Sequence, residues 1–352
     1  MISSVRLQNF RSYGDASFEF EPGVNIVVGP NASGKTNLLE SVMLLARGSS
    51  YRARDMEVVR FGKEWARLEG DFEKQNRVLK IVLGAGQPAK TFEIDTKQFK
   101  RLSFERTIPI VYFEPNHLQL ISRGPDQRRD YFDELLERSR PGFKALLAGY
   151  RRTLAQRNAL LKHGRGKANQ QLFAWDVRLS ETGGQIAQAR QQLIDDINIG
   201  ISRTYSQIAK HKSAVEIRYG SQFPADGYAS RMLSRLQSSV NTDLERGFTG
   251  SGPHREDFIF YLNAQPAAQA ASRGESRSLL LALKIFELGL IEKARGQKPV
   301  FLLDDVFSEL DGARRRALVA RLKKHQTIIT TTDAEAAIEY FQSGDYKIIA
   351  LA

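Results

Sequence analysis

The chain has 352 residues, a formal net charge of +12 and no cysteine. This length is enough for two domains with real cores, and the absence of cysteine excludes disulfides and thiolate metal sites. The sequence contains no run of 18 apolar residues, which a membrane-spanning helix would need, and residues 1–7 lack the layout of a signal peptide. We therefore expect a cytoplasmic protein with no membrane partner. The positive charge favours a polyanionic partner, although a basic protein without one is the plain alternative.

The N-terminal segment predicts three strands and a helix. Residues 5–10 and 17–21 alternate between apolar and polar side chains, and residues 25–28 form a short apolar strand. A helical pattern begins at Thr36, directly after a loop that fits G-x-x-x-x-G-K-[ST]: Gly29, Pro30, Asn31, Ala32, Ser33, Gly34, Lys35 and Thr36. Backbone N–H groups of such a loop cradle a triphosphate, Lys35 reaches the β- and γ-phosphates, and Thr36 coordinates Mg²⁺.

The middle of the chain changes from β-rich to helical. Strands are predicted at 65–72, 78–83, 92–94 and 109–113, and helices from about 125 to 212. The helical part is interrupted at Pro141-Gly142 and at a basic turn, 164–169, and Gly183-Gly184 is a candidate break. Leu172, Leu179, Ile186 and Leu193 recur every seven residues, which indicates an arm with partial coiled-coil character.

Several basic residues in this arm are candidates for contacts with nucleic acid. A solvated helix face is the alternative for any such cluster taken singly. The candidates fall in one short stretch: Arg151, Arg152, Arg157, Lys162, Arg165 and Lys167.

The last third of the chain returns to mixed structure. Strands are predicted at 215–219, 258–262, 300–303 and 327–329, with helices at 279–291 and 314–324. The apolar strand at 300–303 ends in Asp304, which would bind Mg²⁺, and Asp305, which is placed to polarise an attacking water as general base. Ser272, Gly274 and Glu275 precede a helix and form a second candidate anion site. One nucleotide does not need two cradles on one subunit, whereas two subunits facing head to tail would use both.

These segments together resemble the Walker A, signature and Walker B motifs of the ABC-type ATPase superfamily, and within it the RecF family, which is related to SMC and Rad50 proteins. The resemblance spans nearly the whole chain, and its last motif is highly specific. It rests on four stretches: residues 7–13 (LQNFRSY), 34–40 (GKTNLLE), 252–257 (GPHRED) and 303–311 (LDDVFSELD).

The resemblance implies an α/β fold: an ABC-type P-loop ATPase head with a mixed sheet and flanking helices, formed by residues 1–120 and 213–352, and an inserted, mainly helical arm at 121–212. It implies a weak DNA-stimulated ATPase without nuclease activity, with ATP and Mg²⁺ as ligands. It also implies that Ser272 contacts ATP of the partner in a head-to-tail dimer. Ser308 to Asp311 would communicate across that dimer, and Arg11 would approach the nucleotide.

The implied role is recombinational and gap repair, in the bacterial cytoplasm at the nucleoid, within the SOS response to DNA damage. The protein would bind single-stranded DNA and its junctions with duplex, and would help to load RecA together with RecR and RecO; hydrolysis would dissociate the dimer. Three departures from the motifs stand out. Glu275 replaces a glutamine, residues 330–333 lack a switch histidine, and no Q-loop glutamine is assigned.

Two other functions share the phosphate-binding loop. The nucleotide-binding subunit of an ABC transporter places its signature about a hundred residues after the loop, whereas here the interval is more than twice that length and contains the basic arm. A P-loop kinase or GTPase would make the serine turn incidental. DNA-stimulated hydrolysis with a steep salt dependence separates the repair ATPase from both.

Overall fold

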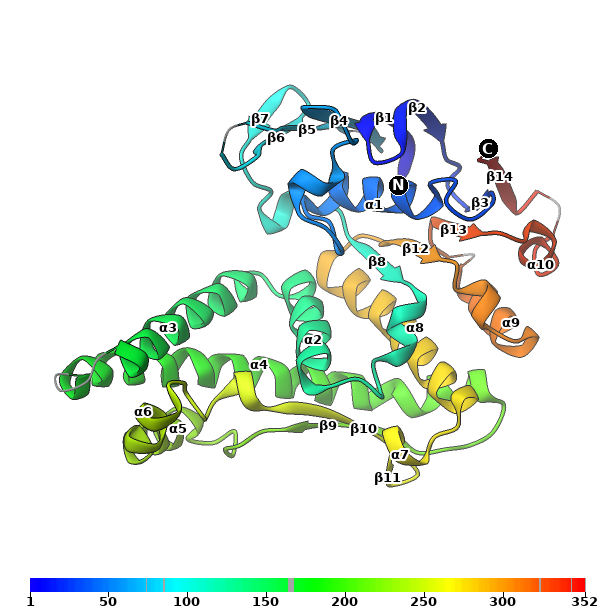
Figure 1. The fold of residues 1–352 in the computed structure, drawn as a ribbon. Coiled ribbons are helices and arrows are strands. Elements are labelled where there is room, and N and C mark those ends of the chain that lie inside the picture. The colour runs from blue at the N-terminus through cyan, green and yellow to red at the C-terminus, as the bar shows by residue number, and fades with distance from the viewer. Residues whose placement is uncertain (74, 85, 164–167, 323, 343, 352) are drawn as a thin grey trace. The chain divides into compact units, whose positions relative to one another are not determined.

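A computed structural model describes residues 1–73, 75–84, 86–163, 168–322, 324–342 and 344–351 (Figure 1). The chain divides into two compact units. Unit 1 contains residues 1–118, 207–209 and 280–352, and unit 2 contains residues 119–206 and 210–279. This division differs from the expected domains, because residues 213–279 group with the helical arm rather than with the head. No helix within the described residues is both long enough and apolar enough to cross a membrane.

Unit 1 contains an antiparallel sheet of six strands in the order β2-β1-β4-β5-β6-β7. Its inward-facing residues alternate along each strand; in β4, for example, Ala66 and Leu68 are buried while Trp65 is exposed. The strands are β1 (Ile2–Phe10), β2 (Tyr13–Glu19), β4 (Trp65–Phe72), β5 (Gln75–Val82), β6 (Ala89–Ile94) and β7 (Lys97–Phe99).

The second sheet of unit 1 is parallel and has the strand order β14-β3-β13-β12-β8. All four residues of β8 and all five of β12 and β13 are buried, as expected for strands covered on both faces. The strands are β3 (Val24–Val28), β8 (Ile110–Phe113), β12 (Val300–Asp304), β13 (Thr327–Thr331) and β14 (Tyr346–Ala350). Because Asp304 pairs with Thr330 and Thr331 with Val28, the carboxyl ends of three strands meet at one edge.

Helix α1 (Lys35–Arg47) lies between the two sheets of unit 1 (Figure 1). Residues 38–46 are buried on every side of the helix, and they share one core with both sheets. The remaining helices of unit 1 are η1 (Asp55–Val58), η2 (Phe104–Arg106), η5 (Phe307–Glu309), α9 (Gly312–Leu322) and α10 (Ala334–Ile338). The 3-10 helix η3 (Pro115–Gln119), α4 (Ala168–Ala209) and α8 (Arg273–Arg295) each have residues in both units.

Unit 2 is built from helices around a three-stranded antiparallel sheet in the order β11-β10-β9. The strands are β9 (Val215–Gly220), β10 (Asp257–Leu262) and β11 (Gln265–Pro266). The helices are α2 (Pro125–Ser139), α3 (Phe143–His163), α4 (Ala168–Ala209), α5 (Tyr228–Ser238), α6 (Val240–Arg246), η4 (Pro253–Arg255) and α7 (Ala267–Ala270). The break at Pro141-Gly142 is confirmed, and the four heptad leucine and isoleucine residues of α4 are buried.

The expected break at Gly183-Gly184 is wrong, because α4 continues through both residues. A Cβ atom at Gly183 would lie 2.9 Å from the sulfur of Met232 in α5 and 3.3 Å from Pro253. The glycine therefore lets α5 and the segment around Pro253 approach the helix closely, instead of ending it. Residues 164–167 of the predicted basic turn, including Arg165 and Lys167, lie outside the described residues.

Candidate nucleotide-binding site

The glycine loop between β3 and α1 has the backbone shape that the motif predicts. Gly34, the residue before α1, has φ 101°, a left-handed conformation that favours glycine. Gly29 is required for a different reason, since a Cβ atom there would lie 2.6 Å from Ser33 Oγ and 2.8 Å from the carbonyl oxygen of Leu351. The loop is thus tightly folded at the N-terminus of a buried helix, where backbone N–H groups and the helix dipole favour an anion.

Lys35 is buried and its charge is held by the loop itself. Its Nζ donates hydrogen bonds to the carbonyl oxygens of Gly29 at 2.6 Å and Pro30 at 2.7 Å. Among the described residues, the buried Ser33 Oγ has no hydrogen-bond partner. A buried cation and an unpartnered hydroxyl at a helix N-terminus fit phosphate oxygens, which would supply the missing acceptors.

Asp304, at the end of β12, is brought directly to the loop. Thr36 Oγ1 donates to its Oδ1 at 3.0 Å, Thr330 Oγ1 donates to the same oxygen at 2.8 Å, and Tyr112 Oη donates to Oδ2 at 3.1 Å. The adjacent hydroxyl and carboxylate oxygens are the hard ligands that Mg²⁺ prefers. No group of three or more His, Asp or Glu side chains within the described ranges could hold a metal ion. A Mg²⁺ ion at Thr36 and Asp304 would therefore complete its shell with water and phosphate oxygens.

Asp305 follows the strand in a left-handed conformation, with φ 51°. Its backbone N–H donates to Thr330 Oγ1 at 3.0 Å, which fixes the turn, while its Oδ1 is buried and lacks a partner among the described residues. Burial raises the pKa of the Asp305 carboxyl above its ordinary value. An oriented carboxylate with a free oxygen and a raised pKa has the properties of a general base.

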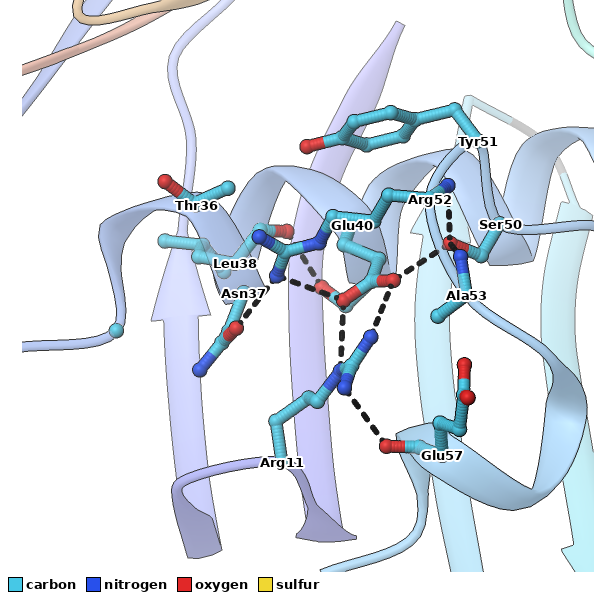
Figure 2. A network of polar contacts seen from close by, with 12 residues as sticks. Arg11, Thr36, Asn37, Leu38, Glu40, Ser50, Tyr51, Arg52, Ala53 and Glu57 are labelled. Atoms are coloured by element: carbon cyan, nitrogen blue, oxygen red, sulfur yellow. Dashed lines mark hydrogen bonds and ion pairs between the residues drawn. The ribbon is translucent and has the colours of Figure 1, made fainter. Parts of the chain in front are cut away.

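Arg11 takes part in an ion-pair network beside α1 (Figure 2). It donates to both carboxylate oxygens of the fully buried Glu40 at 2.9 Å each and to the Glu57 carbonyl oxygen at 2.7 Å; Arg52 donates to Glu40 at 2.9 Å. Burial alone would raise the pKa of Glu40, but hydrogen bonds from Arg11, Arg52 and Ser50 lower it. The network positions Arg11 through Glu40, and contact of Arg11 with a nucleotide stays a prediction.

The serine turn in unit 2 forms a capping box at the start of α8. The Ser272 backbone N–H donates to Glu275 Oε2 at 2.8 Å, and the Glu275 N–H donates to Ser272 Oγ at 3.2 Å. These hydrogen bonds lower the pKa of Glu275. Gly274 is the second residue of α8. The glutamate that replaces the usual glutamine therefore has a local role in starting the helix, and Ser272 itself is exposed.

The residues expected to communicate between subunits follow the two aspartates. Ser308 is exposed, and its Oγ donates to the Asp305 carbonyl oxygen at 2.7 Å. The exposed Asp311 accepts a hydrogen bond from the Arg314 backbone N–H at 3.0 Å and forms an ion pair with the Arg314 side chain. A hydrogen bond to the backbone thus connects Ser308 to Asp305, the candidate general base.

Comparison with known proteins places this site in a family. The model of the RecF/RecN/SMC N terminal domain matches residues 1–343. A DNA replication and repair protein RecF from Heliobacterium modesticaldum is 36% identical to this chain, over 99% of the chain and 97% of its own length. Another from Desulfitobacterium hafniense is 34% identical, over 95% and 94%. The chain belongs to the RecF family.

Solved structures agree with this assignment. The structure of the recombination mediator protein RecF-ATPrS in the RecFOR pathway is 29% identical, has a TM-score of 0.86, and covers 100% of this chain and 96% of its own. The Smc head domain from Pyrococcus furiosus, 16% identical with a TM-score of 0.53 over 99% and 92%, shares the fold alone. The predicted mixed α/β head with a helical arm is therefore confirmed, and membership of the RecF family argues against the transporter subunit and the P-loop kinase.

The structure also shows site residues that the sequence analysis missed. Tyr112 Oη, whose single proton goes to Asp304, also lies 2.6 Å from Tyr51 Oη and 3.2 Å from Glu114 Oε2. Glu114 directly follows β8, the strand next to β12, at the edge where Asp304 lies, and burial raises the pKa of Glu114. Tyr112 gave no signal, because a tyrosine in an apolar strand is ordinary core.

The basic residues of the arm that were expected to contact DNA divide into exposed residues and one buried residue. Arg152 and Lys162 are exposed, and Arg151 is exposed with Asp130 at 3.7 Å. The expectation for Arg157 is corrected, because this residue is fully buried. Its guanidinium donates to Asp176 at 2.6 Å and to Asp243 at 2.7 Å, since α3 turns it toward α4 and α6. An internal arginine with two carboxylate partners holds helices together and cannot reach a DNA phosphate.

Proposed function

We propose that this chain is an ATP-dependent DNA-binding ATPase of recombinational and gap repair. The observation that carries the proposal is the hydrogen bond between Thr36 and Asp304, 3.0 Å long, which joins two segments 268 residues apart into one nucleotide and metal site. Membership of the RecF family and the net charge of +12 support a nucleic-acid partner. Single-stranded DNA and its junctions with duplex are the proposed substrates.

In the proposed mechanism the chain's own groups bind, orient and move a proton. The loop N–H groups and Lys35 hold the phosphates of ATP. Mg²⁺, held by Thr36 and through Asp304, would neutralise charge on the phosphate oxygens. Asp305 accepts a proton from water as the water oxygen attacks the γ-phosphorus, the β–γ bond breaks, and ADP and phosphate result.

The serine turn is proposed to act on a second copy of the chain. Ser272 is exposed at a helix N-terminus, which suits a hydroxyl that reaches the γ-phosphate bound by the partner. Two copies arranged head to tail would enclose ATP, with Ser308 and Asp311 linking the two sites. Hydrolysis would then open the dimer and release DNA. ATP hydrolysis would thus set how long the dimer holds DNA, and the DNA itself would not be chemically changed. We expect weak DNA-stimulated turnover and no nuclease activity.

The proposed cellular setting follows the family. The solved RecF structures are described as part of the RecFOR pathway. On that basis we propose RecR as a direct partner, RecO and RecA as members of the same pathway, and the bacterial cytoplasm, at the nucleoid, as the location.

Sedimentation with ATP, with and without gapped DNA, tests the proposal. The wild-type chain is expected to dimerise only with ATP and to bind gapped DNA with an affinity that falls steeply with salt. Lys35→Met is the matched negative variant, because it removes the cation of the loop; it should lose ATP binding by about 100-fold and remain a monomer. A wild-type chain that stays monomeric with ATP and gapped DNA at micromolar protein would refute the dimer and its role.

A further inference from the structure

Two aromatic side chains are exposed to solvent near the start of β4 in unit 1. Phe61 is fully exposed in the segment before β4, and Trp65, the first residue of the strand, is 43% exposed. Val82 on β5 is the cross-strand partner of Trp65 and is 48% exposed. Large apolar side chains gathered at the surface, away from the core, indicate a contact surface for another molecule.

The surface beside Trp65 is hollowed. The hollow has a volume of about 340 Å³ and is lined by Gln8, Trp65, Ala66, Arg67, Lys80 and Val82. Trp65 and Val82 give it an apolar wall, and its lining is almost wholly apolar. The Gln8 amide and the Arg67 guanidinium donate to Asp15 and Glu69. A ligand with a flat apolar face matches such a surface beside an exposed ring, and a nucleobase is such a ligand.

Cations alternate with the aromatic residues in this part of the chain. Residues 60–67 read Arg-Phe-Gly-Lys-Glu-Trp-Ala-Arg, and Gly62, with φ 77°, makes the turn that separates Phe61 from Trp65. Arg67 is paired with Glu69 at 2.8 Å, but within the described part of the chain the exposed Arg60, Lys63 and Lys80 have no ion-pair partner. These three charges are available for phosphate groups.

We infer that this aromatic-basic patch, made of Phe61, Trp65, Val82, Arg60, Lys63 and Lys80, binds single-stranded DNA by base stacking. Bases stack on the two rings, and the cations follow the phosphates. A duplex buries the faces of its bases, so it gains nothing from the rings. The inference rests on the proposed function for its DNA partner, and it adds a location and a preference for unpaired strands.

Fluorescence provides the first test, because the chain has only two tryptophans, Trp65 and Trp175. In a Trp175→Phe variant, all tryptophan emission comes from Trp65. Titration with an oligo-dT of about 12 nucleotides should quench this emission saturably, since a stacked base contacts the indole directly. Unchanged emission at concentrations that bind a labelled copy of the oligonucleotide would overturn the inference.

Affinities of aromatic variants provide the second test. Phe61→Ala and Trp65→Ala should each weaken oligo-dT binding at least about fivefold and leave duplex binding unchanged. Phe173→Ala is the control, because Phe173 on α4 is an aromatic residue with a similar exposed fraction, 52%. An abasic oligonucleotide of equal length should bind the wild-type chain and Trp65→Ala equally. Equal oligo-dT affinities of Trp65→Ala and the control would overturn the inference. Patch variants that alter self-association but bind oligo-dT as the control does would overturn it as well.

The failure of this inference can be told apart from failure of the proposed function. ATP-dependent dimerisation and duplex binding are measured on the same variants. If the wild-type chain dimerises and binds duplex but the patch variants match the control, only the stacking site is wrong. If the wild-type chain binds no DNA of any form, the proposed function fails, and the inference fails with it.

Discussion

The residues proposed to act on ATP form two halves, which the proposal assigns to different copies of the chain and which are built in opposite ways. The half in unit 1 is buried and already bonded to itself: Lys35 to the loop carbonyls, and Thr36, Thr330 and Tyr112 to Asp304. The half in unit 2 is an exposed turn, in which Ser272 and Glu275 cap the start of α8 with hydrogen bonds to each other. Preorganisation favours the first half for binding and hydrolysis, whereas the second half is available to another molecule.

The largest expected effect concerns the buried half. Asp305→Asn removes the general base but keeps the shape of the turn, so ATP turnover should fall about 100- to 10,000-fold while ATP binding persists. Because the triphosphate is then not cleaved, the nucleotide-bound dimer should accumulate. Turnover and sedimentation measured on one preparation check both statements. Wild-type turnover in the variant would mean that the buried half does not carry the chemistry.

A second prediction concerns the packing of unit 2 around the buried side chain of His254. His254 is neutral in its setting, because Tyr150 Oη lies 2.7 Å from its Nδ1 and its Nε2 lies 3.1 Å from the Thr249 carbonyl oxygen. Burial lowers the pKa of His254 from 6.5 to about 4. The unfolded chain therefore binds the proton first as the pH falls. The contribution of neutral His254 to the free energy of unfolding is fully present above about pH 6.5. It is lost as the pH falls toward 4, and the loss is about 3 kcal/mol at most.

His254→Gln is the matched variant, since its amide can replace both hydrogen bonds without titrating. Urea unfolding between pH 4 and pH 7 should show a smaller loss of stability in this variant than in the wild-type chain. If the free energy of unfolding of the variant and of the wild-type chain depends on pH in the same way, His254 is not held neutral, and the packing around residues 252–257 is looser than these hydrogen bonds require.

A third prediction concerns the exposed half. Ser272→Arg places a bulky cation at the start of α8, so ATP-dependent dimerisation should weaken at least about 30-fold, the cost of losing an interface hot spot. ATP binding should stay within about twofold, as for most surface substitutions. Ser234→Arg is the control, because Ser234 is an exposed serine on α5. Equal dimerisation of the two variants, measured by sedimentation, would reject the role of Ser272 in trans.

The smallest expected effect refines the account of the buried half. Tyr112→Phe removes a hydroxyl that donates to Asp304, so the Mg²⁺ concentration needed for half-maximal ATP binding should rise about tenfold. Tyr261→Phe, in unit 2, should leave it unchanged. A Mg²⁺ titration of ATP binding separates a role in positioning Asp304 from a purely structural one, because general destabilisation would not alter the dependence on Mg²⁺.

The sequence predicted that the glycine loop and the two aspartates lie together, but it did not predict the surroundings of several buried residues, and the reason is physical. The loop residues 29–36 and the aspartates 304 and 305 follow short local patterns, and parallel pairing then brings them together. Buried charges have no local pattern. Arg157 looked like its exposed neighbours on α3, because its partners Asp176 and Asp243 are distant in sequence. Tyr112 was missed for the same reason, and Gly183 looked like a helix break because its close neighbour Met232 is equally remote.

The edge position of β14 bears on how the protein is synthesised. β3, which leads into the phosphate loop, lies between β13 and β14, and the Leu351 backbone N–H donates to the Val28 carbonyl oxygen at 2.7 Å. On the ribosome, β3 therefore emerges some 300 residues before both of its neighbours. A nascent chain would expose both edges of this apolar strand until β13 and β14 have been synthesised, so we expect the phosphate loop to be held in place only after that point.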